Sequence, residues 1–325
     1  MHRTLMYPTA AVALTVAGLL SLATPAAIAG DSDGHGSRPP AASPVAPGSV
    51  FTPTHAVFLP IVVGPPPTPT PTATPVCPAS SSNHYSAGAA LQFDADNPVR
   101  PAWNHADKNI TLRGYLANTD LGLKRELVNY GSDDPTQPPQ LATLFSPSRV
   151  PALSAFYRVY GWNWSPSPEP GTRGLPLTNY PVTALGLQTT PGEPLHLPTS
   201  GYDIGQGMEA LVIFADERTI ALRYTREDSS ASSGYTVHVD NICTDPNLLA
   251  LYNTLDSPTG PRYQYYGAGY SYDLPVLYAG QTFGTARSTQ IVVAIADTGT
   301  FMDTRSCNEW WQQRPGYPGS CPAHE

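Results

Sequence analysis

Short apolar segments separated by polar turns fill the part of the chain from residue 201 to residue 303. Residues 210–214 form an unbroken apolar run, and after a charged turn the apolar residues within 220–224 alternate with others. Alternation with a period of two is typical of a β-strand, so this stretch predicts a hairpin with one buried face. Residues 235–240 alternate in the same way and predict a half-buried strand with a polar outer row.

One short helix is expected in the same region. Asp245 can cap a helix and Pro246 suits its first turn, so the apolar run 248–252 is predicted to be helical. Residues 280–284 and 291–295 predict two further strands bounded by glycine-containing turns. The expected order is three strands, one helix and two strands, which indicates a mainly β fold.

The upstream half of the globular region has sparser strand signals. Residues 90–93 and 110–115 are the best candidates, and residues 155–164 are the most aromatic segment of the chain. Its alternating rings suit either the inner row of a sheet or an exposed platform for sugar rings.

The composition of the first 76 residues is typical of an export signal followed by a linker. Residues 1–29 combine a basic start, an apolar core and a small-residue cleavage site, which predicts a secretory signal peptide. Residues 30–76 are rich in Pro and Thr, which favours extended geometry and predicts a linker. Within this linker, the apolar residues 56–63 suit either a strand that docks on the domain or on the cell surface, or an apolar patch without a binding role.

Charge and cysteine content narrow the class of protein. A net charge of −8 without a basic cluster argues against nucleic acid as a partner, and no segment after the signal peptide is apolar enough to span a bilayer. Four cysteines in an exported chain most simply form two disulfides, for which three pairings exist. We favour Cys307–Cys321, which closes a short tail, and this leaves Cys77 to join Cys243.

The landmarks of the downstream region occur in the order of a known family. Residues 201–204 (GYDI) are similar to its H-x-G-x-D-[IL] opening strand, 251–255 (LYNTL) to its LYAHL helix end, 279–284 (AGQTFG) to its xAGQxIG turn, 290–295 (QIVVAI) to its HLHFEI strand and 299–303 (GTFMD) to its G-x-x-x-D-P exit. On these landmarks the chain resembles the M23 (LytM-type) zinc metallopeptidases and the duplicated hybrid motif barrel on which they are built.

The resemblance implies a domain organisation. Residues 201–325 are expected to form a barrel-sandwich domain with one short helix and a disulfide-tied tail. Residues 77–200 are expected to form a loop-rich β region, with additional strands, that packs on this domain.

The resemblance also implies that the catalytic zinc site is lost. M23 enzymes need three protein ligands and an open position for water, and histidine supplies most of the ligands. Asp203 keeps the aspartate ligand, but the family's histidines correspond to Thr199, Thr254, Gln290 and Val292. We therefore expect no catalytic residue and no cofactor.

The leading hypothesis is an exported or cell-surface, non-catalytic M23-like protein that binds or organises cell-envelope material. Its partner would be peptidoglycan, another glycan or an envelope protein. The candidate binding residues come from the opening turn and from the paired strands, and they are Tyr202, Asp203, Arg223, Arg226, His238 and Asp240.

One alternative is an active zinc metallo-endopeptidase with non-standard ligands. In that case Asp203 would be joined by His196, His238 or His105. His105 and Asp107 would share a face of an extended strand, as a metal site or a catalytic dyad requires, although a structural histidine accounts for the pair as well.

A second alternative is a carbohydrate-binding or adhesion module. It would use the aromatic segment, through Trp162 and Trp164, together with the paired Trp310 and Trp311 of the tail.

Overall fold

The computed structural model describes residues 77–93, 100–119, 127, 138–165, 171–264 and 269–305. All of these residues belong to one compact unit, residues 69–325. The expected signal peptide and linker lie outside the described residues, as do Cys307, Cys321, Trp310 and Trp311.

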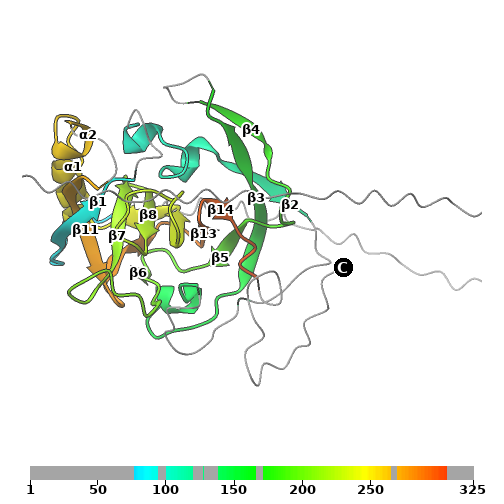
Figure 1. Cartoon of the computed structure of the whole chain (residues 1–325). Coiled ribbons are helices and arrows are strands. Elements are labelled where there is room, and N and C mark those ends of the chain that lie inside the picture. Colours follow the sequence, from blue (N-terminus) through cyan, green and yellow to red (C-terminus); the bar gives the residue numbers. More distant parts are fainter. Residues whose placement is uncertain are drawn as a thin grey trace, which may run out of the picture. The chain divides into compact units, whose positions relative to one another are not determined.

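The described part of the chain is mainly β, as expected (Figure 1). Its strands are β1 (Ser86–Leu91), β2 (Tyr115–Asn118), β3 (Leu153–Asn163), β4 (Thr172–Pro176), β5 (Ala184–Gln188), β6 (Pro194–His196), β7 (Met208–Ala215), β8 (Thr219–Arg223), β9 (Tyr235–Asp240), β10 (Ile242–Thr244), β11 (Ser271–Tyr278), β12 (Thr282–Ala286), β13 (Gln290–Asp297) and β14 (Thr300–Phe301). The α-helices are α1 (Pro246–Leu255) and α2 (Pro261–Gln264), and short 3-10 helices occur at Ala102–Asn104, Ile110–Leu112 and Leu141–Leu144.

The strands form two antiparallel sheets. The large sheet has the order β1–β11–β7–β8–β9–β13–β5–β3–β2, with β4 beside β3 and β14 beside β13, and the small sheet has the order β10–β12–β6. β5 and β6 precede residue 200, yet β5 pairs with β13 and β6 pairs with β12. Strands from both sides of residue 200 therefore share both sheets.

The β7–β8 hairpin is confirmed, but the prediction of one buried face is wrong. Every residue of β7 and β8 is buried, and so are Thr236 and His238 in the expected outer row of β9. The largest core cluster lies on one face of these strands, and upstream residues such as Ala90, Ala102 and Ile110 join clusters on the other. Period-two alternation could not reveal this second cover, because it comes from distant parts of the chain.

The helix prediction is confirmed in position and in mechanism. α1 starts after Asp245, whose side chain accepts hydrogen bonds from the backbone N–H groups of Asn247 and Leu248. Leu248 and Tyr252 are buried, and the Tyr252 ring packs edge-on against Phe214 of β7. The helix therefore covers part of the sheet. No helix within the described ranges is long and apolar enough to cross a bilayer.

Two upstream predictions need correction. Residues 110–115 do not form one strand, because a 3-10 helix occupies Ile110–Leu112 and β2 begins only at Tyr115. His105 and Asp107 lie in a turn rather than on a strand. There His105 accepts a hydrogen bond from the Asp107 N–H, and the Asp107 carboxylate pairs with Arg113. The pair is therefore part of a local structural network.

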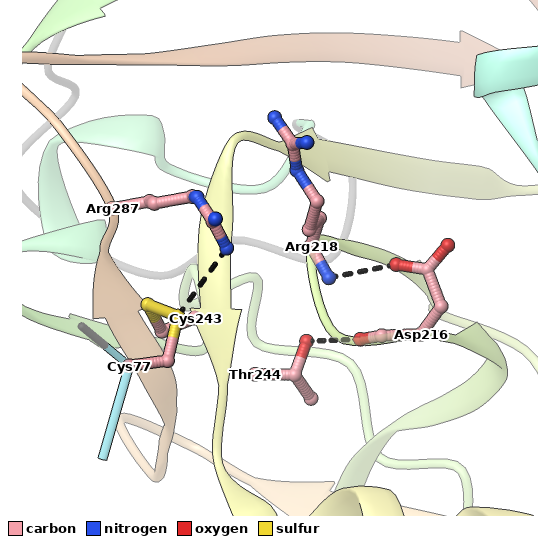
Figure 2. Close-up of a disulfide and its surroundings, with 6 residues drawn as sticks. All are labelled: Cys77, Asp216, Arg218, Cys243, Thr244 and Arg287. Atoms are coloured by element: carbon pink, nitrogen blue, oxygen red, sulfur yellow. Dashed lines mark hydrogen bonds between the residues drawn. A yellow bond between two sulfur atoms is a disulfide. The ribbon is translucent and has the colours of Figure 1, made fainter. Parts of the chain in front are cut away.

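The Cys77–Cys243 disulfide is confirmed. It joins the first described residues to β10, 166 positions further along the chain (Figure 2). The start of the described chain is thus covalently attached to the small sheet.

Candidate functional site

Tyr202 and Asp203 lie in the turn that precedes β7. The Asp203 carboxylate is exposed and accepts hydrogen bonds from the N–H groups of Gly205 and Gly207, at 2.7 and 3.1 Å, so it stabilises its own turn. Tyr202 packs with its ring about perpendicular to that of Tyr235, at 6.3 Å between centroids. Both residues have local structural roles in this arrangement.

Arg223 and Arg226 also bind backbone of their own chain. Arg223 is fully buried and donates to carbonyl oxygens of the loop before β9, including Ser232 O at 2.9 Å and Gly234 O at 2.7 Å. Burial lowers the pKa of this guanidinium to about 10. Arg226 donates to the Ala89 carbonyl of β1. The two arginines therefore attach loops to the sheet and do not form a shared cluster with His238.

His238 is buried within the large sheet, with 1 % of its surface exposed. Its ring lies 5.6 Å from the Phe301 ring, and neither ring nitrogen has a hydrogen-bond partner in the part of the chain that the structure describes. Burial, assisted by the nearby positive charge of Arg113, lowers the pKa of His238 to about 3. The imidazole is therefore neutral and inaccessible at neutral pH, and it cannot line a groove.

The proposed alternative zinc ligands are not brought together. Asp203 precedes β7, His238 lies in β9, and His196 lies in the small sheet with Nδ1 3.0 Å from the Gly280 carbonyl oxygen. Among the described residues, no group of three His, Cys, Asp or Glu side chains is close enough to hold a metal ion. His105 is buried beside the Trp164 ring, at 5.0 Å between centroids.

The arrangement of strands gives a different candidate site. β13 pairs with β9, β5 and the short β14, whereas β7, which follows Asp203, is separated from β13 by β8 and β9. On the β5 side, Gly186 lies opposite Val292, and Ala184 lies on the same face of β5 two residues before it. β9 and β5 are therefore the strands whose residues lie directly beside those of β13.

A group of polar side chains surrounds this pairing, and we call it the Gln290 cluster; its members are Ser154, Tyr157, Gln290, Tyr115 and Asp240. The Gln290 carboxamide accepts from Ser154 Oγ at 2.7 Å and lies 3.0 Å from the Tyr157 hydroxyl. It lies flat over β5, because a Cβ added to Gly186 would be 2.7 Å from it. The glycine therefore makes room for the amide.

The second half of the Gln290 cluster is organised around Asp240. Its Oδ1 accepts hydrogen bonds from Thr219 Oγ1 and from the N–H of Asn241. Burial and, after it, the nearby Asp240 carboxylate raise the pKa of the Tyr115 hydroxyl well above its ordinary value, so this hydroxyl stays protonated. The Tyr115 and Tyr157 rings lie 5.8 Å apart and connect the two halves.

No model of a known protein family matches the chain, and no curated protein is significantly similar to it. The side chains of the Gln290 cluster supply hydroxyls, one carboxamide and one carboxylate, which donate and accept hydrogen bonds. Such groups suit reversible binding of a chain that is rich in amides and hydroxyls.

The aromatic segment is packed against other parts of the unit. Phe156 and Val159 of β3 are buried. Trp162 of β3 and Trp164, just after the strand, are half-buried with their rings 6.3 Å apart. The guanidinium of Arg100 lies over the Trp164 ring at 4.9 Å. The strand thus combines core positions with partly exposed rings, and it does not present a uniform aromatic platform.

Proposed function

We propose that this protein is an exported, non-catalytic relative of M23 peptidases that binds peptide or glycan chains of the cell envelope. The observation that carries the proposal is the pairing of β5 with β13, with Gly186 opposite Val292.

The pairing supports aligning the H-x-G-x-D motif with residues 184–188 of β5 instead of residues 199–203. Zinc lies about 2.0–2.3 Å from each ligand atom, so ligands drawn from two strands require those strands to be neighbours. β5 fulfils this requirement and Asp203 does not. Ala184, Gly186 and Gln188 have the spacing of H-x-G-x-D, with alanine and glutamine in the two ligand positions.

The residues in these positions support a loss of catalysis. Ala184 and Val292 carry no atom that can bind zinc, and a neutral carboxamide at Gln188 is a poor substitute for a carboxylate. The same face is also covered, because Ala184 and Val292 belong to a buried apolar cluster with Ile110 and Phe301. A metal-bound water would have no room there.

The placement of the protein outside the cytoplasm is part of the proposal. The Cys77–Cys243 disulfide supports it, because such bonds persist in oxidising compartments. The signal-peptide pattern of residues 1–29 supports it independently. The Pro- and Thr-rich residues 30–76 would then serve as a spacer between the binding unit and its point of attachment.

Co-sedimentation with purified peptidoglycan tests the proposal. The wild-type protein is expected to sediment with the polymer. Each lost hydrogen bond costs about 0.5–1.5 kcal/mol, so the double variant Gln290→Ala/Tyr157→Phe should bind about tenfold more weakly. Asp203→Ala is the matched control and should bind like the wild type.

Three outcomes would contradict the proposal. A wild-type protein that stays in solution has no affinity for this polymer. Loss of binding in Asp203→Ala with normal binding in the double variant would place the site at the opening turn. Zinc at about one ion per purified chain, together with cleavage of the polymer, would favour the active peptidase.

A further inference from the structure

The two cysteines of the Cys77–Cys243 disulfide differ in their exposure. Cys243 lies in β10 and is 3 % exposed, whereas Cys77 is partly exposed. A thiolate attacks a disulfide along the axis of the sulfur–sulfur bond and must reach one of the two sulfurs. An external thiolate can therefore reach the Cys77 sulfur more readily than the Cys243 sulfur.

A positive charge stands beside the accessible sulfur. Arg287, in the turn between β12 and β13, extends toward the disulfide, with Nη1 3.5 Å from Cys77 Sγ (Figure 2). No carboxylate in the described ranges forms an ion pair with Arg287. A guanidinium in this position attracts an incoming thiolate and stabilises Cys77 as a thiolate once the bond is broken.

The chain that follows Cys77 is attached mainly by side chains. We call residues 77–85 the strap, since β1 starts at Ser86 and the strap makes no backbone–backbone hydrogen bond with the rest of the described chain. Ser81 Oγ and Asn83 Nδ2 donate to Asp245 Oδ2, at 2.6 and 2.7 Å, and Asn247 donates to two strap carbonyls. Without the disulfide, the strap is retained by these polar contacts, by the hydrogen bonds of Tyr85 Oη to the Thr282 carbonyl and of Gln281 to the His84 carbonyl, and by the packing of Tyr85 on the main core.

The strap also forms one wall of a partly open cavity. A space of about 300 Å³ lies between strap residues, among them Pro78 and Ser81, and the start of α1 and β12, represented by Pro246 and Thr285. Detachment of the strap would remove one wall of this cavity and two of the hydrogen bonds that Asp245 receives.

We propose that Cys77–Cys243 is a thiol-exchange site at which an external dithiol, of the kind carried by dithiol oxidoreductases, releases the strap while the sheets stay folded. One thiolate of the dithiol attacks the Cys77 sulfur, the disulfide breaks, and Cys243 leaves as a thiolate and takes up a proton. The second thiolate of the dithiol then attacks the other sulfur of the same dithiol, which is bound to Cys77 in the mixed disulfide. This step releases Cys77 as a thiolate beside Arg287 and leaves the dithiol as a disulfide. Two electrons pass from the dithiol to the protein.

The test is reduction of the full-length folded protein by dithiothreitol. Samples are quenched with an alkylating reagent and mapped by mass spectrometry, which separates labels on Cys77 and Cys243 from labels on Cys307 and Cys321. Arg287→Gln should slow reduction about fivefold at low salt, and the difference should shrink in 1 M salt, because close charges are then screened. Arg218→Gln, an exposed arginine drawn in the same view, is the control and should keep the wild-type rate (Figure 2).

Limited proteolysis and hydrogen–deuterium exchange of the reduced protein provide the second measurement. New proteolytic cleavage within residues 77–85 that is absent from the oxidised protein, with hydrogen-exchange protection retained in β7, β8 and β9, supports release of the strap. Loss of protection throughout these strands would show that the disulfide is an ordinary structural bond, and the proposal would fail. It would also fail if Arg287→Gln were reduced at the wild-type rate, or if Arg218→Gln slowed the reaction equally.

Discussion

His238 should make the protein sensitive to mild acid. The imidazole is 1 % exposed and packed beside Phe301, and burial lowers its pKa to about 3. The pKa of histidine in the unfolded chain is about 6.5. Because the folded value is the lower one, the unfolded chain takes up the proton first as the pH falls. Stability from this group is therefore complete above pH 6.5 and decreases from there down to about pH 3.

The size of the effect follows from the two pKa values. At pH 4.5 the unfolded chain is protonated at this residue and the folded chain is not, which costs about 2.7 kcal/mol of stability. His238→Leu removes the titration and also removes two buried nitrogen atoms that lack partners within the described residues. The free energy of unfolding of the variant minus that of the wild type should therefore be about 2.7 kcal/mol higher at pH 4.5 than at pH 7.

Urea unfolding at the two pH values measures this change. Carboxylates contribute to the pH dependence of both proteins and cancel in the comparison. His196→Gln, at a partly exposed histidine in β6, is the control and should follow the wild type. If the stability difference between wild type and His238→Leu were the same at pH 4.5 and pH 7, the assignment of His238 as a buried neutral imidazole would be refuted.

Three further perturbations test the packing by urea or thermal unfolding. Asp228→Asn should destabilise the protein by about 3–5 kcal/mol, because it breaks a buried ion pair with Arg262 at 2.8 Å, and an unchanged unfolding midpoint would contradict this. Gly284→Ala should lower the melting temperature, since the added Cβ would lie closer than 3.0 Å to the Cys243 carbonyl oxygen, whereas Gly174→Ala, whose Cβ would meet its nearest neighbours at 3.4 Å, should not clash. Asp245→Ala should cost about 1–2 kcal/mol through the lost helix cap, and helix content measured by circular dichroism should fall with it.

Patterns among residues close in sequence were sufficient to predict several strands and one helix. The β7–β8 hairpin and β9 follow from apolar runs and alternation, and α1 follows from the Asp245 cap. These features are determined by residues close in sequence, so a single sequence contains them. β11 was missed because the proline within it weakens the strand signal, although the strand lies between β1 and β7.

The candidate site could not be predicted in the same way. The Gln290 cluster combines residues of β2, β3, β9 and β13, which become neighbours only through strand order. The resemblance to H-x-G-x-D was placed on Asp203 because that residue is a carboxylate, whereas Ala184 and Gln188, which our proposal aligns with the same motif, carry no charge. The pairing of Gly186 with Val292, on which that proposal depends, is contained only in the structure.

The position of β5 has a consequence for how the chain reaches its native state. β5 and β13 are more than one hundred positions apart in sequence, yet each completes the hydrogen bonding of the other. Contacts of such high contact order form late and slowly, so β13 spends the early stages of folding with one bare edge. β13 is apolar along most of its length, and a bare apolar edge recruits strands from other molecules. A fragment beginning at residue 201 would carry this edge permanently, and we expect it to aggregate where the longer chain folds.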